Sequence, residues 1–436
     1  MGTVIKVIEK ETSGVSFSSR KYCHDTGDRS GIDYDDNKDI VWKEYGETEK
    51  LTKPVNLKAA ADARSGYPSI FTFFLDGSRH TYKVDDMSFQ KNVYPIIAGQ
   101  IGVGCCERRD FTLRPALSFE RKLVIVLPDR AFSTDWDGQD QAKPLLEKVN
   151  RNARLRKQQP VYFSDLLIYD TNKDEKFEKK GVAKIQDYMV EMEKQLVADL
   201  VAIGKLDESN YLIKDGSLDY QRVSTKKNKH ALNLSNEHIR NNYRRVIGVS
   251  KSFDPTKCFV HGGGTNSNII AELELYERTP AFRYTSTRAN VDFCIWYLRI
   301  RDARYTHSIF DGILKIEKLI VTEKEQVHGI ETDDINNITA YLINERNPVC
   351  YGADDRWANH LYPVYLTEQY VWPVPSLCRL ERFATGRRVD RQRADQSGYR
   401  NLGRVFDPQP FPTSNIRVMY VLRPTPNQLS AEYQEL

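Results

Sequence analysis

The chain has 436 residues, 40% of them hydrophobic and 28% charged, with a formal net charge of +4 at pH 7. This composition is typical of a soluble globular protein, and no run approaches the roughly 18 apolar residues that a membrane helix needs. The N-terminal stretch MGTVIKVIEKETSGVSFSSR lacks a continuous apolar segment, so we expect no secretory signal and a cytoplasmic location. The seven cysteines include no Cys-x-x-Cys pair, which argues against a structural zinc site.

Residues 1–66 are polar and are predicted to form an N-terminal extension, followed by one domain over residues 67–436. The domain opens with FTFFLDGSRHTYKV, in which two apolar runs flank Asp-Gly-Ser, and this arrangement predicts a β-hairpin with a tight turn. Further apolar runs predict strands over residues 94–106 and 121–129. A polar insertion is expected at about residues 130–180.

Apolar residues recur at helical spacing in GVAKIQDYMVEMEKQLVADLVAIGK, which predicts an amphipathic helix over residues 181–205. The stretch NYLIKDGSL then predicts a strand that runs into Asp215, and LSNEHIRNNYRR predicts a helix that begins at Ser235 or Asn236. The remaining predicted elements are strands over 245–253, 292–301 and 312–321, a helix over 332–347, and a last strand in NIRVMYVLRP. This order of strands and helices favours an α/β fold.

Two apolar strands of the prediction end in the same tripeptide, Asp-Gly-Ser, at Asp76 and at Asp215. A buried carboxylate is costly unless it is paired, capped or bound to a metal ion. For a single copy, the simpler interpretation is a turn, because glycine accepts positive φ and aspartate bonds its own backbone. The second copy favours a shared site instead.

The predicted helix between the two aspartates carries Glu191 and Glu193 within its apolar stripe. The order strand-Asp, helix-Glu, strand-Asp can bring three carboxylates to one edge of a sheet. Hard oxygen ligands of this kind suit Mg²⁺ or Mn²⁺. Two such ions roughly 3.5–4 Å apart can hydrolyse a phosphodiester bond.

This order of acids is that of ribonuclease H-like nucleases, and the segments FFLDGSRHTYKV, MEKQLV, LIKDGSL, VIGVSKS and HLYPVYLTEQY together resemble the NurA nuclease family. The resemblance spans about residues 68–375. It implies a ribonuclease H-like mixed sheet flanked by helices, with Asp76, Asp215 and one helix glutamate as ligands of Mn²⁺ or Mg²⁺. Glu193 is preferred because the apolar Met192 precedes it, as in the family pattern, and Glu191 remains open.

The resemblance also assigns roles outside the acids. Lys251 in GVSKS would lie near the scissile phosphate, where an ammonium group offsets developing charge, although a solvated lysine after a strand is an equal alternative. Tyr362 in the Tyr-Pro pair would contribute to catalysis, or else belong to an aromatic packing segment. The family commonly has a histidine about two helical turns later, and this chain has Glu368 there instead.

Arginines near these motifs are candidates for DNA binding: Arg79, Arg278 and Arg283. For the last two, a surface salt bridge is the alternative. Basic clusters that could guide a DNA backbone, or form solvated faces, lie at 151–157, 225–230, 240–245 and 386–393.

These features predict a metal-dependent deoxyribonuclease, cutting as an exonuclease, an endonuclease or both. The resemblance implies a homodimer that works with a HerA-like hexameric ATPase in DNA end processing and repair or in antiviral defence. The alternative is a non-catalytic DNA-binding or assembly subunit that keeps the fold, which the missing histidine favours. A stand-alone endonuclease or an RNA-directed enzyme of the same fold stays open, because many polynucleotide enzymes share these acids.

Overall fold

The structure is a computed structural model of the whole chain. It describes residues 2–24, 40–42, 44–89, 91–110, 112–132, 138–151, 162–172, 176–220, 236–255, 258–260, 265–286, 290–306, 308–346 and 357–371. The predicted strand in NIRVMYVLRP lies outside these residues.

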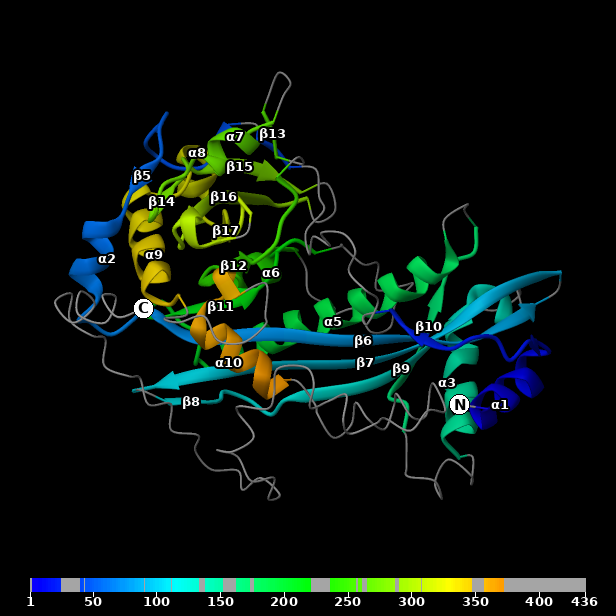
Figure 1. Cartoon of the computed structure of the whole chain (residues 1–436). Coiled ribbons are helices and arrows are strands. Elements are labelled where there is room, and N and C mark those ends of the chain that lie inside the picture. The colour runs from blue at the N-terminus through cyan, green and yellow to red at the C-terminus, as the bar shows by residue number, and fades with distance from the viewer. Residues whose placement is uncertain are drawn as a thin grey trace, which may run out of the picture.

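Fifteen of the described strands form one mixed sheet, and helices flank it (Figure 1). Along the sheet the strands follow the order β10-β9-β7-β6-β11-β12-β17-β16-β14-β5, and most pairs are antiparallel. The strands of this path are β5 Val55–Asn56, β6 Phe71–Phe89, β7 Asn92–Arg109, β9 Glu120–Pro128, β10 Asp165–Tyr169, β11 Tyr211–Asp215, β12 Val246–Ser250, β14 Glu277–Arg278, β16 Asp292–Arg299 and β17 Ile313–Leu319. The shorter strands off this path are β1 Val15–Ser16, β2 Tyr22–Cys23, β4 Glu44–Tyr45, β8 Thr112–Pro115 and β15 Phe282–Thr285, and β3 Ile40–Trp42 pairs separately with β13 Cys258–Val260.

The helices are α1 Gly2–Thr12, α2 Lys58–Arg64, α3 Gly138–Arg151, α5 Phe177–Ala202, α6 Asn236–Asn242, α7 Ser267–Ala271, α8 Glu323–His328, α9 Thr332–Asn344 and α10 Tyr362–Val371. None of these described helices is long and apolar enough to cross a membrane.

The mixed sheet and its flanking helices confirm the predicted α/β class. The predicted long amphipathic helix is also confirmed as α5, which begins earlier than predicted, at Phe177.

The predicted hairpin at Asp76-Gly77-Ser78 is wrong, because β6 runs straight through these residues as one strand of 19 residues. Asp76, Gly77 and Ser78 pair with Gly104, Val103 and Gly102 of β7, so the ladder is unbroken. The chain reverses only between Phe89 and Asn92. Buried aromatic and aliphatic residues on both sides of the tripeptide hold it in the sheet. The first Asp-Gly-Ser is thus not a turn.

Two segments predicted as polar additions contain packed elements. Within the N-terminal 66 residues, α1 buries Val4, Ile5 and Ile8 in the core. Within the predicted insertion, β10 pairs in parallel with β9. Its apolar run, Asp165–Tyr169, is short and lies between polar segments, so the sequence did not predict this strand.

The sheet separates two hydrophobic clusters. One, which includes Phe73 and Leu75 of β6, packs against α5 through Leu196 and Val197. The other, which includes Phe74 of β6, packs against α9 and α10. Because successive residues of a strand face opposite sides, this division decides on which side each polar residue of β6 and β11 lies.

Candidate active site

The two aspartates of the Asp-Gly-Ser motifs lie next to each other on neighbouring parallel strands. Lys214 of β11 pairs with Leu75 of β6, so the residues that follow, Asp215 and Asp76, are also adjacent. Their side chains are hydrogen-bonded to each other, and Asp76 is only 5% exposed. The register of the sheet brings together two of the three carboxylates of the prediction, and Asp76 lies within β6 rather than at the end of a strand.

Both aspartates face the side of the sheet that α10 covers. Cys106 of β7, which is paired with Phe74, interacts with Asp76 and also with Thr367 of α10. Gly104, directly opposite Asp76, lies against Val371 of α10. The acids therefore sit between the sheet and this helix.

The environments of the two carboxyl groups push their pKa values apart. Burial, together with the charges of Asp215 and Glu368, raises the pKa of Asp76 well above its usual range. Burial would also raise the pKa of Asp215, but the ammonium group of Lys251 outweighs it and lowers that pKa. The environment of the pair thus favours the protonated form of Asp76 and the ionised form of Asp215.

Lys251 follows the last residue of β12 and places its ammonium group beside this pair. Its Nζ lies 2.9 Å from Oδ2 of Asp215 and 3.3 Å from Oε2 of Glu368 on α10. Burial disfavours the charged form, yet the charges of Asp215 and Glu368 raise the pKa of Lys251 above its usual value. The alternative of a solvated lysine is excluded, because this side chain is only 5% exposed.

The structure does not bring Glu193 to the two aspartates. Glu193 lies on α5, on the opposite face of the sheet, where its Oε2 is 2.9 Å from Nζ of Lys214. Its Oε1 reaches β6 at Gly77, where an added Cβ would come within 2.3 Å. Burial raises the pKa of Glu193, and Lys214 offsets part of that rise.

Glu191, the other candidate on the helix, is engaged in a similar way. Its Oε1 lies 2.6 Å from Nζ of Lys194, and both side chains are nearly inaccessible. Each helix glutamate therefore has a buried lysine as its partner. The spacing of Glu191 and Lys194 on one helix is visible in the sequence, whereas the partner of Glu193 comes from the strand β11 and could not be predicted from spacing.

The sequence did not predict that two further residues, Glu368 and His360, lie at the site. Glu368 stands where the resembled family commonly has a histidine, and its carboxylate contacts Lys251. His360, which precedes α10, is 2% exposed, and its electrostatic interaction with Asp215 helps to lower the pKa of that carboxyl group. Its ring packs edge-on against Tyr365. Tyr362 begins α10, where its backbone N–H donates to the carbonyl of Glu345.

Comparisons with solved structures find proteins of related shape, among them a nuclease. The chain is similar to the NurA nuclease from Sulfolobus solfataricus, with a TM-score of 0.34 and 11% sequence identity over 76% of this chain and 81% of that one. No protein-family model and no curated protein matches the chain. A TM-score this low does not establish a shared fold, so the site rests on its own residues.

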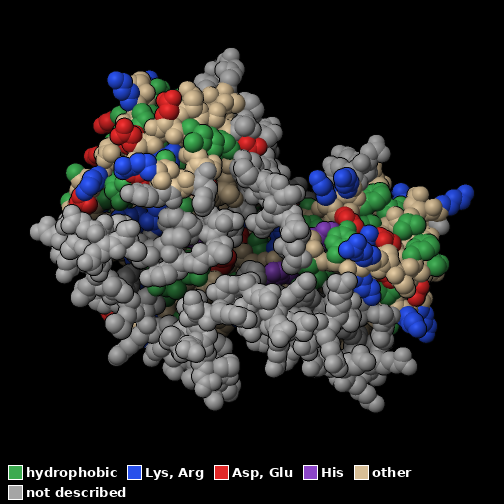
Figure 2. All heavy atoms as spheres, in the orientation of Figure 1, with side chains coloured by type: hydrophobic (Ala, Val, Ile, Leu, Met, Phe, Trp, Pro, Cys, Tyr) green, Lys and Arg blue, Asp and Glu red, His purple; other side chains and the backbone are tan. Residues whose placement is uncertain are grey.

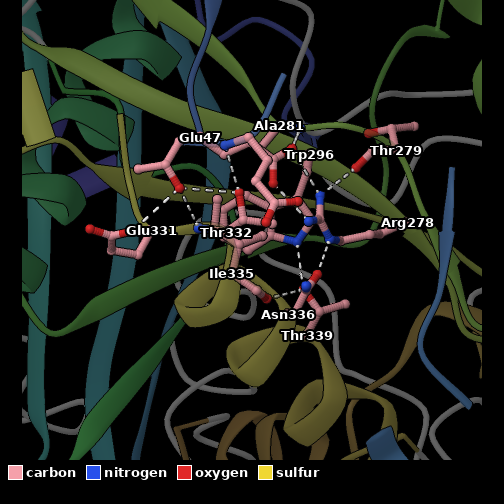
Figure 3. A network of polar contacts seen from close by, with 12 residues as sticks. Glu47, Arg278, Thr279, Ala281, Trp296, Glu331, Thr332, Ile335, Asn336 and Thr339 are labelled. Atoms are coloured by element: carbon pink, nitrogen blue, oxygen red, sulfur yellow. Dashed lines mark hydrogen bonds and ion pairs between the residues drawn. The ribbon is translucent and has the colours of Figure 1, made fainter. Parts of the chain in front are cut away.

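The predicted DNA-binding arginines have partners within the protein. Arg278 is fully buried, and its guanidinium bonds both oxygens of Glu47 and the side chain of Asn336 (Figure 3). This network ties the segment before β5 to α9, which leaves Arg278 no surface for a DNA phosphate. Arg283 pairs with Asp292 at 2.6 Å, and Arg79 donates to Gln186 at 2.6 Å.

The basic clusters are only partly described. In the cluster at 240–245, Arg240 donates to the carbonyl of Val321, and Arg244 and Arg245 both pair with Glu208. The clusters at 225–230 and 386–393, and residues 152–157 of the first, lie outside the described residues. On the face shown in Figure 2, the coloured Lys and Arg side chains lie among Asp and Glu rather than in a separate basic area.

Among the described residues, no group of three or more His, Cys, Asp or Glu side chains has the geometry of a metal site. The aspartate pair supplies buried carboxylate oxygens, which are the ligands that hard dications such as Mg²⁺ and Mn²⁺ prefer. Two carboxylates alone do not complete such a site, and the ammonium group of Lys251 already neutralises Asp215.

Proposed function

We propose that this protein is a metal-dependent deoxyribonuclease with a ribonuclease H-like, NurA-like fold. The observation that carries the proposal is the buried pair Asp76–Asp215, on adjacent strands, with the ammonium group of Lys251 beside it. Ionisable groups with strongly perturbed pKa values cluster at functional sites, and the buried ammonium group of Lys251 could bind an anionic substrate. The sequence resemblance supports the same activity.

In this proposal each residue has a defined task. Asp76 and Asp215 would hold the cation, and the ammonium group of Lys251 favours the ionised form of Asp215. Mn²⁺ or Mg²⁺, when bound, supplies Lewis-acid polarisation of the phosphodiester. Lys251 stabilises negative charge that develops on the phosphate. Tyr362, at the start of α10, is proposed to orient the DNA strand, whereas Arg79 bonds Gln186 of α5 on the other face of the sheet and has no part in the site.

The proposal extends to partners. DNA is the substrate, and a homodimer working with a HerA-like hexameric ATPase in DNA repair or antiviral defence follows from the sequence resemblance. Addition of such an ATPase to a cleavage assay tests this part, since an authentic partner increases the rate of degradation of long duplex DNA. An unchanged rate would contradict the partnership without touching the nuclease activity.

A non-catalytic DNA-binding subunit is the second candidate, and one observation favours it. Lys214 and Lys251 already neutralise acids that a two-ion nuclease would use for its metals. A subunit of this kind would bind DNA without any requirement for divalent ions, which would only weaken binding as other salts do.

Cleavage of labelled single-stranded and double-stranded DNA with Mn²⁺, Mg²⁺ or EDTA separates the two candidates. We expect metal-dependent cutting by the wild type and its loss in Asp76→Asn and Asp215→Asn, which keep size but remove charge. Asp199→Asn on the outer part of α5 is the matched control and should cut normally. A wild type that never cuts, with or without an ATPase partner, would exclude the nuclease.

A further inference from the structure

The second Asp-Gly-Ser motif ends a strand, whereas the first lies within one. Asp215 is the last residue of β11, and Gly216 follows it with a φ of +83°, which glycine adopts without strain. The chain turns there, and Leu218 comes to lie over β12, where an added Cβ on Gly248 would be 2.6 Å from its Cγ. Beyond Asp76, in contrast, β6 continues its ladder with β7. The chain after Asp215 is therefore held by the contacts of the turn.

Two charged residues lie on either side of this turn. Lys214 of β11 and Glu317 of β17 both pair with Gly248, so the three residues form one row across the sheet. Because cross-strand partners point to the same face, both side chains lie on the α5 face. Leu218 fills the space over the glycine between them. The turn is thus enclosed by a lysine on one side and a glutamate on the other.

Both side chains form hydrogen bonds with the residues of the turn. Nζ of Lys214 donates to the carbonyls of Asp215 and Ser217, at 3.1 and 3.2 Å. Oε2 of Glu317 accepts from the N–H of Leu218 at 2.7 Å and from the hydroxyl of Ser217 at 2.9 Å. These bonds fix the backbone directly after the carboxylate-bearing residue.

Each of the two residues also has a buried ion partner. Glu193 pairs with Lys214, as described above, and Lys315 pairs with Glu317 at 2.6 Å. None of the four side chains is more than 8% exposed. Buried ion pairs are weak evidence for stability, because the cost of desolvation offsets their attraction, and their best-attested use is to select one conformation. The network is therefore suited to holding one conformation of the turn.

We propose that Lys214 and Glu317 are positioning residues for Asp215. They hold the turn on the α5 face and so fix the end of β11, which keeps the carboxylate on the other face beside Lys251, 2.9 Å away. The inference rests on the proposed function, in which Asp215 takes part in the reaction. Misplacement of a reacting group by about 1 Å can cost about 10²-fold in rate. A loosened turn should therefore affect the rate of cleavage rather than the binding of DNA.

Single-turnover cleavage at increasing DNA concentration separates these two quantities. The double variant Glu317→Gln with Lys315→Met removes the charge that holds the turn, together with the ammonium group that would lose this carboxylate. We expect its rate at saturation to fall by about 10–100-fold, the usual effect of removing a supporting group, at an unchanged half-saturating DNA concentration. Glu325→Gln with Lys318→Met is the matched control, since it removes another ion pair of β17, on the opposite face, and should cut normally.

A milder pair of variants, at Ser217, serves if the double variant does not fold. Ser217→Ala removes the hydroxyl that donates to Glu317, and Ser217→Thr keeps it. The alanine variant should cut more slowly at saturation, and the threonine variant should recover the rate. A purely structural role would lower the melting temperature and leave the rate of the folded protein unchanged, and that result would overturn the inference.

Hydrogen exchange of single amides tests the inference without DNA. The N–H of Gly216 donates across to β12 at the end of β11 that carries Asp215. In the double variant at Glu317 this amide should exchange at least about tenfold faster, the effect of one lost hydrogen bond to a charged group. The N–H of Leu212, bonded at the start of β11, should exchange as in the wild type.

The two measurements distinguish failure of the inference from failure of the proposed function. Unchanged exchange of Gly216 would overturn the inference whether or not the protein cuts DNA. A wild type that cuts no DNA would refute the nuclease, and the exchange of Gly216 would then decide by itself whether Lys214 and Glu317 hold the end of β11.

Discussion

Replacement of Gly77 by alanine tests how Glu193 is packed. The new Cβ would lie 2.3 Å from Oε1 of Glu193 and 3.2 Å from Sδ of Met189. The methionine can move, but Lys214 holds the glutamate. We expect Gly77→Ala to lower the free energy of unfolding by about 1–3 kcal/mol, the usual cost of overpacking.

The decisive comparison is made in a second background, Glu193→Ala with Lys214→Met, where the obstructing carboxylate is gone. There the same substitution should be neutral or should stabilise by roughly 0.5–1 kcal/mol, because alanine is favoured over glycine within a strand. Urea unfolding of the four proteins measures this coupling. An equal cost of Gly77→Ala in both backgrounds would refute the proposed clash and place the strain in the strand itself.

Three further outcomes are expected. Glu47→Gln should destabilise by about 3–5 kcal/mol because it leaves Arg278 charged and buried, and Glu47→Gln with Arg278→Met should recover much of this loss in urea unfolding. Lys251→Met should lower the single-turnover cleavage rate of the folded protein by about 10²–10³-fold, and it should also destabilise the fold because it leaves Asp215 without its buried partner. Burial opposes the ionised form of Glu325, but Lys318 and backbone donors lower its pKa, so its contribution is present above about pH 4.3 and lost as the pH falls through the lowered pKa. The difference in melting temperature between wild type and Glu325→Gln should accordingly vanish in acid.

The sequence predicted the position of the aspartates better than their surroundings. Apolar runs into Asp76 and Asp215 correctly indicated neighbouring strands, since strand burial follows from residue type alone. The tripeptide was nevertheless misread as a hairpin turn in its first copy. Local turn preferences could not show that Gly77 is required for the approach of Glu193, which comes from a helix distant in sequence.

The sequence also could not predict on which face of the sheet each acid lies. Lys214 and Asp215 are consecutive, so they necessarily point to opposite sides of β11. The connections between strands and helices decide which face α5 covers and which face α10 covers. The spacing of apolar residues in the sequence does not determine these connections. The contact of Glu368 with Lys251 could not be predicted for this reason, although the apolar spacing of Val364, Thr367 and Val371 marked its helix as packed.

Arg278 shows the same limit for charged residues. In the sequence alone, a basic residue near a motif cannot be distinguished from a residue that binds phosphate, because its partner in the fold is unknown. That partner, Glu47, comes from the N-terminal part of the chain and is itself buried. Composition does not distinguish a buried ion pair from a binding site.

The continuous strand β6 has a consequence for the kinetics of folding. Its long antiparallel ladder with β7 joins segments close in sequence and can form early. The parallel pairing with β11, which brings Asp215 to Asp76, closes a much longer loop and is expected to form late. Bound Mn²⁺ should for that reason slow the unfolding rate while leaving the refolding rate nearly unchanged. The ion would stabilise the pairing of β6 with β11, which is the last to form.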